Sequence, residues 1–156
     1  QPLTAVLCEN LQDPGNLGTI IRSSLAFGAS ALILSKGSVD LYNPKVVRSA
    51  MGALFDLPIS SGENIGDILS SLKEAGFEII ALSPEAKQAF LTLEYGKKIA
   101  IVLGNEGNGL TAEADAITTK EAHIEISPQV ESLNVAVAAS VVLFHIQKSK
   151  RTVTNS

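Results

Sequence analysis

Hydrophobic positions along the chain fall into two alternating kinds of segment. Short runs rich in Val, Ile and Leu are typical of strands buried on both faces, and longer amphipathic runs separate them. This alternation predicts an α/β fold, a mostly parallel sheet flanked by helices on both faces. Strands are expected within residues 4–10, 31–37, 78–84 and 122–127, a strand with a glycine loop within 98–107, and helices within 16–28, 43–57, 65–76 and 132–148.

Residues with helix-ending preferences stand near the ends of these runs. Asn16 can cap the first helix, Gly28 can end it, and Ser132 stands just before the last apolar run. Their positions support the expected helix boundaries.

The last predicted helix has almost no polar face over its first three turns. A helix that is apolar all round must be covered all round. One side can lie on the sheet, and a partner subunit is the simplest cover for the other; an upstream domain of the same chain is the alternative. The apolar residues are Val135, Val137, Ala138, Val141, Val142, Leu143 and Phe144.

Composition narrows the class of protein. With 156 residues and 46% hydrophobic content, one globular domain is expected over residues 1–148, followed by a polar tail over 149–156. No membrane-spanning run or secretory signal is apparent, so a cytoplasmic location is expected. The single Cys8 lies in an apolar segment and is expected to pack as a small buried hydrophobe.

The net charge of −4 excludes the broad basic field of a self-sufficient nucleic-acid binder. The chain opens on Gln1, directly at a strand-like segment, which suggests a domain of a longer protein. If the protein acts on RNA, an N-terminal RNA-binding domain outside this sequence is therefore expected to assist it.

The segment IVLGNEGNGLT, residues 101–111, ends an apolar run in a glycine loop. Glycines let a ligand approach backbone N–H and C=O groups closely. The loop is nearest to the phosphate-binding pattern G-x-x-x-x-G-K-[ST], but Leu110 replaces the lysine and Glu106 has the wrong charge for a phosphate. A ligand with a positive or neutral reacting centre, such as a sulfonium cofactor, fits better; a plain Gly-rich turn is the alternative.

The segment NLGTIIR places Arg22 between two small residues on one helix face, Gly18 and Ala26. Helical side chains lean toward the N-terminus, so the guanidinium is expected to lie over Gly18 with room for another group. This setting suits recognition of a phosphate or an alkoxide, and an ordinary surface arginine is the alternative.

The segment PQVESLNVAV places Ser132 and Asn134 at the start of the buried helix. Unpaired N–H groups at a helix start favour either a capping side chain or an anion. Capping is the simpler interpretation when this segment is considered alone.

Together the three segments resemble the motifs of the SpoU or TrmH family of RNA 2′-O-ribose methyltransferases, within the SPOUT superfamily. The matching stretches are N-L-G-x-x-x-R over 16–22, L-G-N-E-G-x-G-L over 103–110 and V-E-S-L-N-V over 130–135. Their order and separations match, and residues 42–58 look like the family's segment between the first two motifs. The resemblance covers nearly the whole chain.

The sequence departs from this family ahead of the third motif. Members commonly carry Ile-Pro-Met there and a glycine shortly after, whereas this chain has Ile124, Glu125, Ile126 and then Pro128. Because of this departure, the sequence determines the RNA substrate less well than it determines the reaction.

The resemblance implies a C-terminal trefoil knot, a rare exception to unknotted topology, with S-adenosylmethionine bound in it largely through backbone groups. It implies a homodimer, no metal, and methylation of a ribose 2′-hydroxyl in structured RNA, with ribosomal RNA favoured over tRNA. A catalytically silent knotted RNA-binding module is the alternative, and a Rossmann-like nucleotide enzyme is a weaker one. The implied cofactor contacts are Leu103, Gly104, Asn105, Gly109, Ile124, Ile126 and Leu133.

The implied reaction is in-line attack of the 2′-hydroxyl on a sulfonium methyl, which needs alignment and stabilisation of the alkoxide. Arg22, which the resemblance places in the partner subunit's site, is interpreted as an electrostatic stabiliser because a guanidinium is very hard to deprotonate. Glu106 is expected to orient Arg22 or a neighbouring polar group. His123 and His145 are expected to have packing or surface roles. The implied catalytic residues are Asn16, Arg22, Glu106, Ser132 and Asn134.

Overall fold

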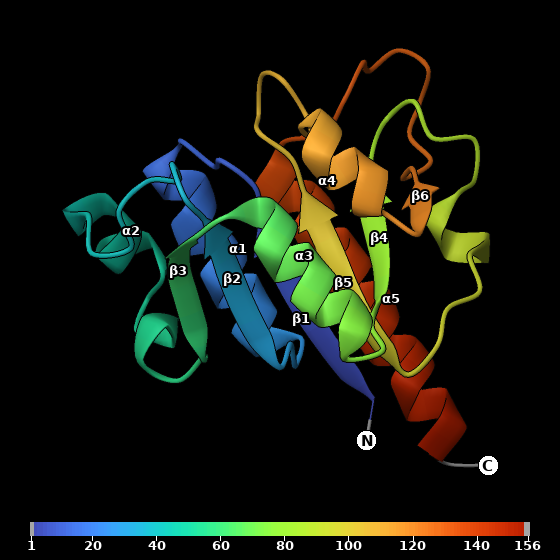
Figure 1. Ribbon diagram of the computed structural model, residues 1–156, viewed down its shortest axis with the longest axis horizontal. Helices are drawn as coiled ribbons and strands as arrows, with labels where there is room; N and C mark the ends of the chain where they lie inside the picture. The colour runs from blue at the N-terminus through green and yellow to red at the C-terminus, as the bar shows by residue number, and fades with distance from the viewer. Residues whose placement is uncertain (1, 155–156) are drawn as a thin grey trace.

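The computed structural model describes residues 2–154, with side chains described as far as Ser149. Its centre is a six-stranded parallel sheet in the order β3-β2-β1-β5-β4-β6, shown in Figure 1. The predicted α/β class is confirmed. The strands are β1 (Leu3–Cys8), β2 (Ala31–Ser35), β3 (Ile59–Glu63), β4 (Glu78–Leu82), β5 (Lys98–Leu103) and β6 (Lys120–Ala122).

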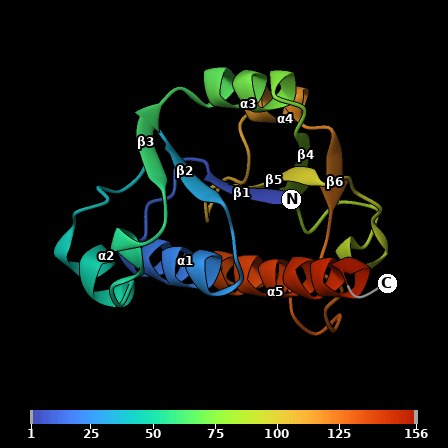
Figure 2. The same cartoon turned by 90° about the horizontal axis from the view of Figure 1, so that it is seen from below.

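Helices cover both faces of this sheet, as Figure 2 shows. Helices α1 (Pro14–Ala26), α2 (Pro44–Ser49) and α5 (Val135–Thr154) lie on one face, and α3 (Ile65–Glu74) and α4 (Ala112–Ile117) lie on the other. The 3₁₀ turns are η1 (Ala53–Phe55) and η2 (Phe90–Thr92).

Alternate residues of the strands point into two separate cores. Val6 of β1 belongs to the larger core, under α1 and α5, with Leu17 of α1. Its neighbour Leu7 belongs to the smaller core, under α3 and α4, with Leu69 of α3. The apolar strand sequences are thus buried on both faces, as the sequence predicted.

The first helix begins at Pro14, two residues earlier than expected. Its cap is Asp13, whose carboxylate accepts the Asn16 N–H at 2.8 Å, and the prediction that Asn16 is the cap is wrong. A carboxylate followed by proline suits a helix start, because proline lacks the N–H that the first helical position cannot use. Gly28 follows the end of the helix with φ 73°, as expected for a glycine there.

The single helix expected over residues 43–57 is broken. Helix α2 ends at Ser49, and the chain then turns through two left-handed residues, Met51 at φ 52° and Gly52 at φ 84°, into η1. Glycine tolerates positive φ and methionine rarely adopts it, so the break is centred on Gly52 and imposes an unusual conformation on its neighbour.

The strand expected over residues 122–127 is largely wrong. Strand β6 ends at Ala122, and His123 then pairs with the segment before η2: its N–H donates to the Gln88 carbonyl at 2.9 Å, and its carbonyl accepts the Phe90 N–H at 2.8 Å. A loop therefore takes the hydrogen bonds that a longer strand would need. Strand β3 and helix α4 were not expected, because β3 is a mostly exposed edge strand and α4 is short.

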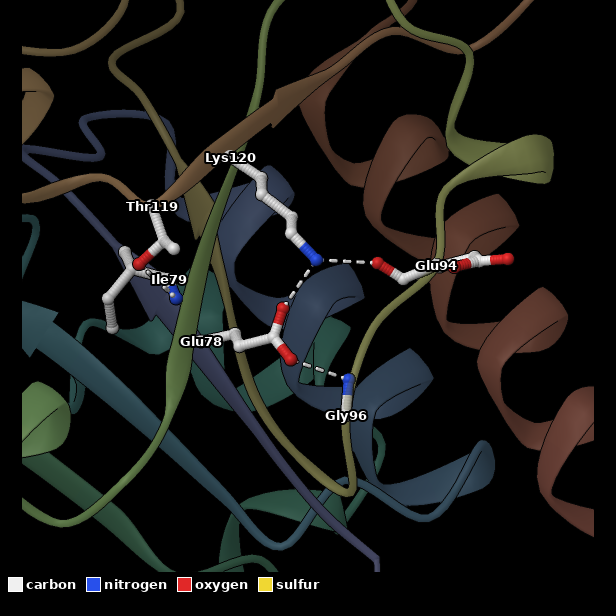
Figure 3. A network of polar contacts seen from close by, with 6 residues as sticks. All are labelled: Glu78, Ile79, Glu94, Gly96, Thr119 and Lys120. Atoms are coloured by element: carbon white, nitrogen blue, oxygen red, sulfur yellow. Dashed lines mark hydrogen bonds and ion pairs between the residues drawn. The ribbon is translucent and has the colours of Figure 1, made fainter.

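An ion pair fastens the β4–β6 edge at the N-terminal ends of these strands, as Figure 3 shows. Lys120 Nζ lies 2.7 Å from a Glu78 carboxylate oxygen and donates to the Glu94 carbonyl at 2.7 Å. The other Glu78 oxygen accepts the Gly96 N–H at 2.7 Å. The hydrogen bond from Lys120 lowers the pKa of Glu78, with the Gly96 N–H acting in the same direction.

Helix α5 packs beside α1 and leaves an apolar strip outward. The Ser23 and Ser140 hydroxyls are 2.7 Å apart, and the Phe27 and Phe144 rings meet edge to face at 5.7 Å. The strip consists of Val137, Val141 and Phe144, which are 48%, 41% and 47% exposed. In the described part of the chain, no helix combines the length and apolarity that a membrane crossing needs.

Candidate functional site

A large cavity lies beyond the carboxyl ends of the strands, where parallel sheets commonly bind ligands. Its volume of ≈ 1250 Å³ exceeds the ~300–1,000 Å³ typical of a small-molecule pocket. The loops after β4, β5 and β6 bound it with the starts of α1 and α5. Except for Arg22, every site residue predicted from the sequence lines it: Asn16, Leu103, Gly104, Asn105, Glu106, Gly109, Ile124, Ile126, Ser132, Leu133 and Asn134.

Arg22 lies instead on the exposed surface of α1. It is six residues beyond Asn16, which corresponds to about 9 Å along the helix axis. The expected open space over Gly18 is absent, because Ser49 of α2 fills it and a Cβ on Gly18 would collide with the Ser49 hydroxyl. The small residue at 18 thus serves the contact between α1 and α2.

The glycine loop, residues 104–111, doubles back on itself beside the cavity. The Asn105 and Gly109 backbones exchange two hydrogen bonds of 3.0 Å, and Gly109 has φ 66°. A Cβ on Gly104 would lie 2.5 Å from the Gly109 carbonyl carbon and 2.8 Å from the Leu110 nitrogen. Gly104 is therefore required by close backbone packing, and residues 104–110 of the loop line the cavity.

Two hydrogen-bonding side chains fasten this loop to the segment before α1. The Glu106 carboxylate accepts the backbone N–H groups of Gln12 at 3.3 Å and Asp13 at 3.0 Å. The Asn105 side chain donates to the Asn10 carbonyl at 2.7 Å. Within the described residues of one chain, Glu106 therefore binds backbone amides, which are neighbouring polar groups, and not Arg22. It fixes the entry to α1.

Glu9 is a third side chain that anchors the glycine loop, and it was not predicted from the sequence. It is 2% exposed at the end of β1, and its carboxylate accepts both the backbone N–H (3.2 Å) and the hydroxyl of Thr111. A carboxylate in the otherwise apolar run TAVLCEN was the available signal, because a buried charge requires partners. Glu9 holds the far end of the glycine loop, where Thr111 caps α4.

Asn16 and Asn134 bring the first and third motifs into contact. The Asn134 side-chain oxygen accepts the N–H groups of Ala136 at 2.9 Å and Val137 at 3.2 Å, so Asn134 caps α5 in place of Ser132. Its amide nitrogen donates to the Asn16 oxygen at 2.9 Å. The Asn16 oxygen is thereby engaged, and its NH₂ group is the donor available to a ligand.

The cavity is acidic. Its lining contains no Lys, Arg or His among the described residues. A side-chain hydrogen bond with Asp115 raises the pKa of Glu121, and burial acts in the same direction. Sequence reasoning missed all but Glu106, because the acids come from separate segments with no common spacing. They are Glu85, Glu106, Asp115, Glu121 and Glu131.

His123 is held by a hydrogen bond to the backbone, and His145 by a ring contact. A ring nitrogen of His123 lies 2.8 Å from the Ala86 carbonyl oxygen, and the His145 ring meets the Phe90 ring edge to face at 5.9 Å. Both side chains are half-buried. Among the described residues, no three His, Cys, Asp or Glu side chains gather as a metal site would require.

The profile of the SpoU rRNA Methylase family matches residues 3–144. The chain belongs to this family. One relative of this SpoU-family chain is the 23S rRNA (guanosine(2553)-2′-O)-methyltransferase RlmP of Bacillus subtilis. It is 34% identical over 142 residues, which cover 91% of the chain and 57% of RlmP.

Two solved structures of similar proteins contain AdoMet. The AdoMet-bound rRNA methyltransferase from Sinorhizobium meliloti superposes with a TM-score of 0.89 at 32% identity, covering 96% of this SpoU-family chain and 57% of that one. The SpoU methyltransferase AviRb from Streptomyces viridochromogenes, in complex with the cofactor AdoMet, gives 0.90 at 27% identity, covering 97% and 62%. The chain spans about half the length of the curated relatives it matches.

Proposed function

We propose that this SpoU-family domain transfers a methyl group from S-adenosylmethionine to a ribose 2′-hydroxyl of ribosomal RNA in the cytoplasm, without a metal. The observation that carries the proposal is the acidic cavity beside the glycine loop, to which all three motifs contribute. The names of the similar proteins, an rRNA 2′-O-methyltransferase and two AdoMet-bound methyltransferases, support both substrates. Transfer RNA is the alternative acceptor.

The cavity suits this cofactor on two grounds. The main chain around Gly104 can hydrogen-bond a polar heterocycle, and Leu103, Ile124 and Leu133 supply apolar surface around it. S-adenosylmethionine, when bound, supplies an electrophilic methyl group on a positively charged sulfur. An acidic lining without cations favours that charge and disfavours a nucleoside phosphate.

The chain's own residues can align the acceptor. The NH₂ group of Asn16, held in place by Asn134, and the exposed hydroxyl of Ser132 are donors suited to ribose and phosphate oxygens. A fixed donor costs no reorganisation when charge develops on the attacking oxygen. The 2′-hydroxyl proton passes to water or to a neighbouring phosphate, and Arg22 stabilises the negative charge.

The position of Arg22 makes a homodimer part of the proposal. Arg22 lies outside the cavity of its own chain, on the helix that packs beside the apolar strip of Val137, Val141 and Phe144. A second copy covering the strip would bury that surface and bring each Arg22 to the partner's cavity. We also propose a trefoil knot formed by the segments that close the cavity, on the basis of the family resemblance.

The test compares Arg22→Ala with His145→Ala, whose ring lies against Phe90. Calorimetry measures S-adenosylmethionine binding, and methyl transfer is followed to 23S rRNA and to tRNA. Both variants should bind the cofactor within about twofold of wild type. Only Arg22→Ala should lose turnover, by about 100-fold or more, as for removal of a group that stabilises transition-state charge. Normal turnover by Arg22→Ala would refute its role.

A subunit-mixing experiment tests the shared site. Arg22→Ala and Asn134→Ala proteins are each inactive under the proposal. In an equal mixture about a quarter of the sites should regain both groups, because half the dimers are mixed and one of their two sites is intact. Absence of recovery, with mixed dimers demonstrated by mass, would place Arg22 in its own subunit's site. Cofactor binding by wild type without transfer to either RNA would instead indicate a silent binding module.

A further inference from the structure

Five exposed side chains stand within residues 42–55, the segment that carries α2 and η1, and we call them the α2 surface. Three of them are large apolar or aromatic groups with most of their area in solvent: Tyr42 is 71% exposed, Met51 69% and Phe55 80%. The other two, Lys45 and Arg48, are exposed cations of α2. The α2 surface thus combines aromatic groups and positive charge.

The local backbone presents these groups outward. Asn43 caps α2 by accepting the Lys45 N–H at 2.9 Å, which places Tyr42 just outside the helix. At the other end the left-handed pair Met51 and Gly52 turns the chain into η1, which ends at Phe55. A methionine held at positive φ with an exposed side chain is an observation that core packing does not explain.

The α2 surface adjoins the first motif, beside α1 and β3 in Figure 1. A Cβ on Gly15 would lie 3.5 Å from Lys45 Cε, and Ser49 fills the space over Gly18. Gly15 is adjacent to Asn16, which lines the cavity. A polynucleotide with one ribose at Asn16 therefore has α2 directly beside its path.

Charge indicates what this surface binds. The cavity lining is acidic and contains no cation among the described residues, so it offers no positive charge to the phosphates that flank an acceptor nucleotide. Lys45 and Arg48 are the charged residues within 41–55, and the exposed acids Asp40 and Asp56 stand immediately outside this range. Cations interleaved with exposed aromatic rings are the pattern by which proteins hold single-stranded nucleic acid.

We propose that the α2 surface binds unpaired RNA flanking the acceptor nucleotide, with bases stacked on Tyr42 and Phe55 and phosphates paired with Lys45 and Arg48. This inference rests on the proposed function. A second copy of the chain is the less favoured occupant, because a symmetric contact through this surface would bring two sets of cations together.

The aromatic part is tested with Tyr42→Ala combined with Phe55→Ala, and the control is Leu91→Ala, an apolar group on η2 that is 54% exposed. The KM for 23S rRNA should rise about 25-fold or more in the double variant, because each of the two stacked bases contributes at least about fivefold. Turnover at saturating RNA and cofactor affinity should stay within about twofold. The control should match wild type.

The electrostatic part is tested with Lys45→Gln and Arg48→Gln, and the control is Lys73→Gln on α3, across the sheet. Binding of a single-stranded uridine 12-mer is measured by fluorescence anisotropy at several salt concentrations. Each α2 variant should reduce the slope of log affinity against log salt by about 0.7, the value for one phosphate contact on a single strand. The control should leave the slope unchanged.

Unchanged KM and slope in the α2 variants would overturn the proposal, as would conversion of these variants from dimer to monomer in sedimentation. Failure of the proposed function has a different signature: wild type transfers no methyl group to RNA. The 12-mer measurements still decide whether the α2 surface binds RNA in that case, because they do not require turnover.

Discussion

Gly104→Ala should weaken cofactor binding through the shape of the glycine loop alone. The new methyl group would lie 2.5 Å from the Gly109 carbonyl carbon, whereas unstrained contacts begin at 3.4 Å. The colliding atoms are backbone, so rotation of a side chain cannot relieve them. The two arms of the loop must separate by about 0.9 Å, the difference between those distances.

Overpacking of this kind typically costs about 1–3 kcal/mol. If the loop relaxes only when no ligand is bound, that cost falls on binding, and the Kd for S-adenosylmethionine rises about five- to 150-fold. If the loop is strained in both states, the cost falls on stability and Tm drops by about 2–4 °C for each kcal/mol. Calorimetric titration and thermal melting of the same samples show how much of the free-energy cost falls on cofactor binding and how much on stability.

Gly107→Ala is the matched control in the same loop. Its Cβ would meet only the Asn105 side-chain oxygen, at an ordinary 3.5 Å, and its φ is not in the left-handed region. It should change the Kd by less than about threefold. If Gly104→Ala had the Kd and Tm of wild type, the close-packed loop would not be what shapes the cavity.

Two further predictions concern groups away from the cofactor. The folded-state pKa of Glu78 is lowered mainly by Lys120, so the pair stabilises the fold above the ordinary glutamate pKa, and this contribution disappears as pH falls through the lowered value. Glu78→Gln should therefore reduce the free energy of unfolding in urea by less than about 1 kcal/mol at pH 7, with a smaller deficit in acid; an equal deficit at every pH would refute the assignment. Burial raises the pKa of Cys8 to about 12, with the charge of Glu106 adding to the effect. A disulfide reagent at pH 8 should label Cys8 only as fast as the protein unfolds, and rapid labelling of the native protein would show that the thiol is accessible.

The sequence predicted the sheet because its central strands are apolar on both faces, which gives a strong and local signal. β3 lacked that signal: it reads ISSGE and lies at an edge, where few positions are buried. The ending of β6 at Ala122 depended on competition from residues 88–90, which are distant in sequence. The sequence therefore predicts that a strand exists where its residues are fully buried. It does not predict where a strand ends when a loop can take over its hydrogen bonds.

The cavity-lining residues were predictable because three motifs stand at element ends, which parallel strands bring to one edge. Their hydrogen bonds were not predictable. The Glu106 carboxylate binds amides 93 and 94 residues away, and no local spacing identifies such partners. The other four acidic residues of the cavity lining were likewise not predictable as site residues, because each stands alone in its own segment of the sequence.

The pairing of β1 with β5 has a consequence for synthesis. During translation β1 is made about 95 residues before its neighbour over residues 98–103, the difference between positions 3 and 98. Until then the free edge of β1 has no partner strand in the nascent chain, and late long-range pairing of this kind slows folding. A nascent chain truncated before residue 98 should therefore need chaperone protection, and full-length folding should be limited by the arrival of this strand.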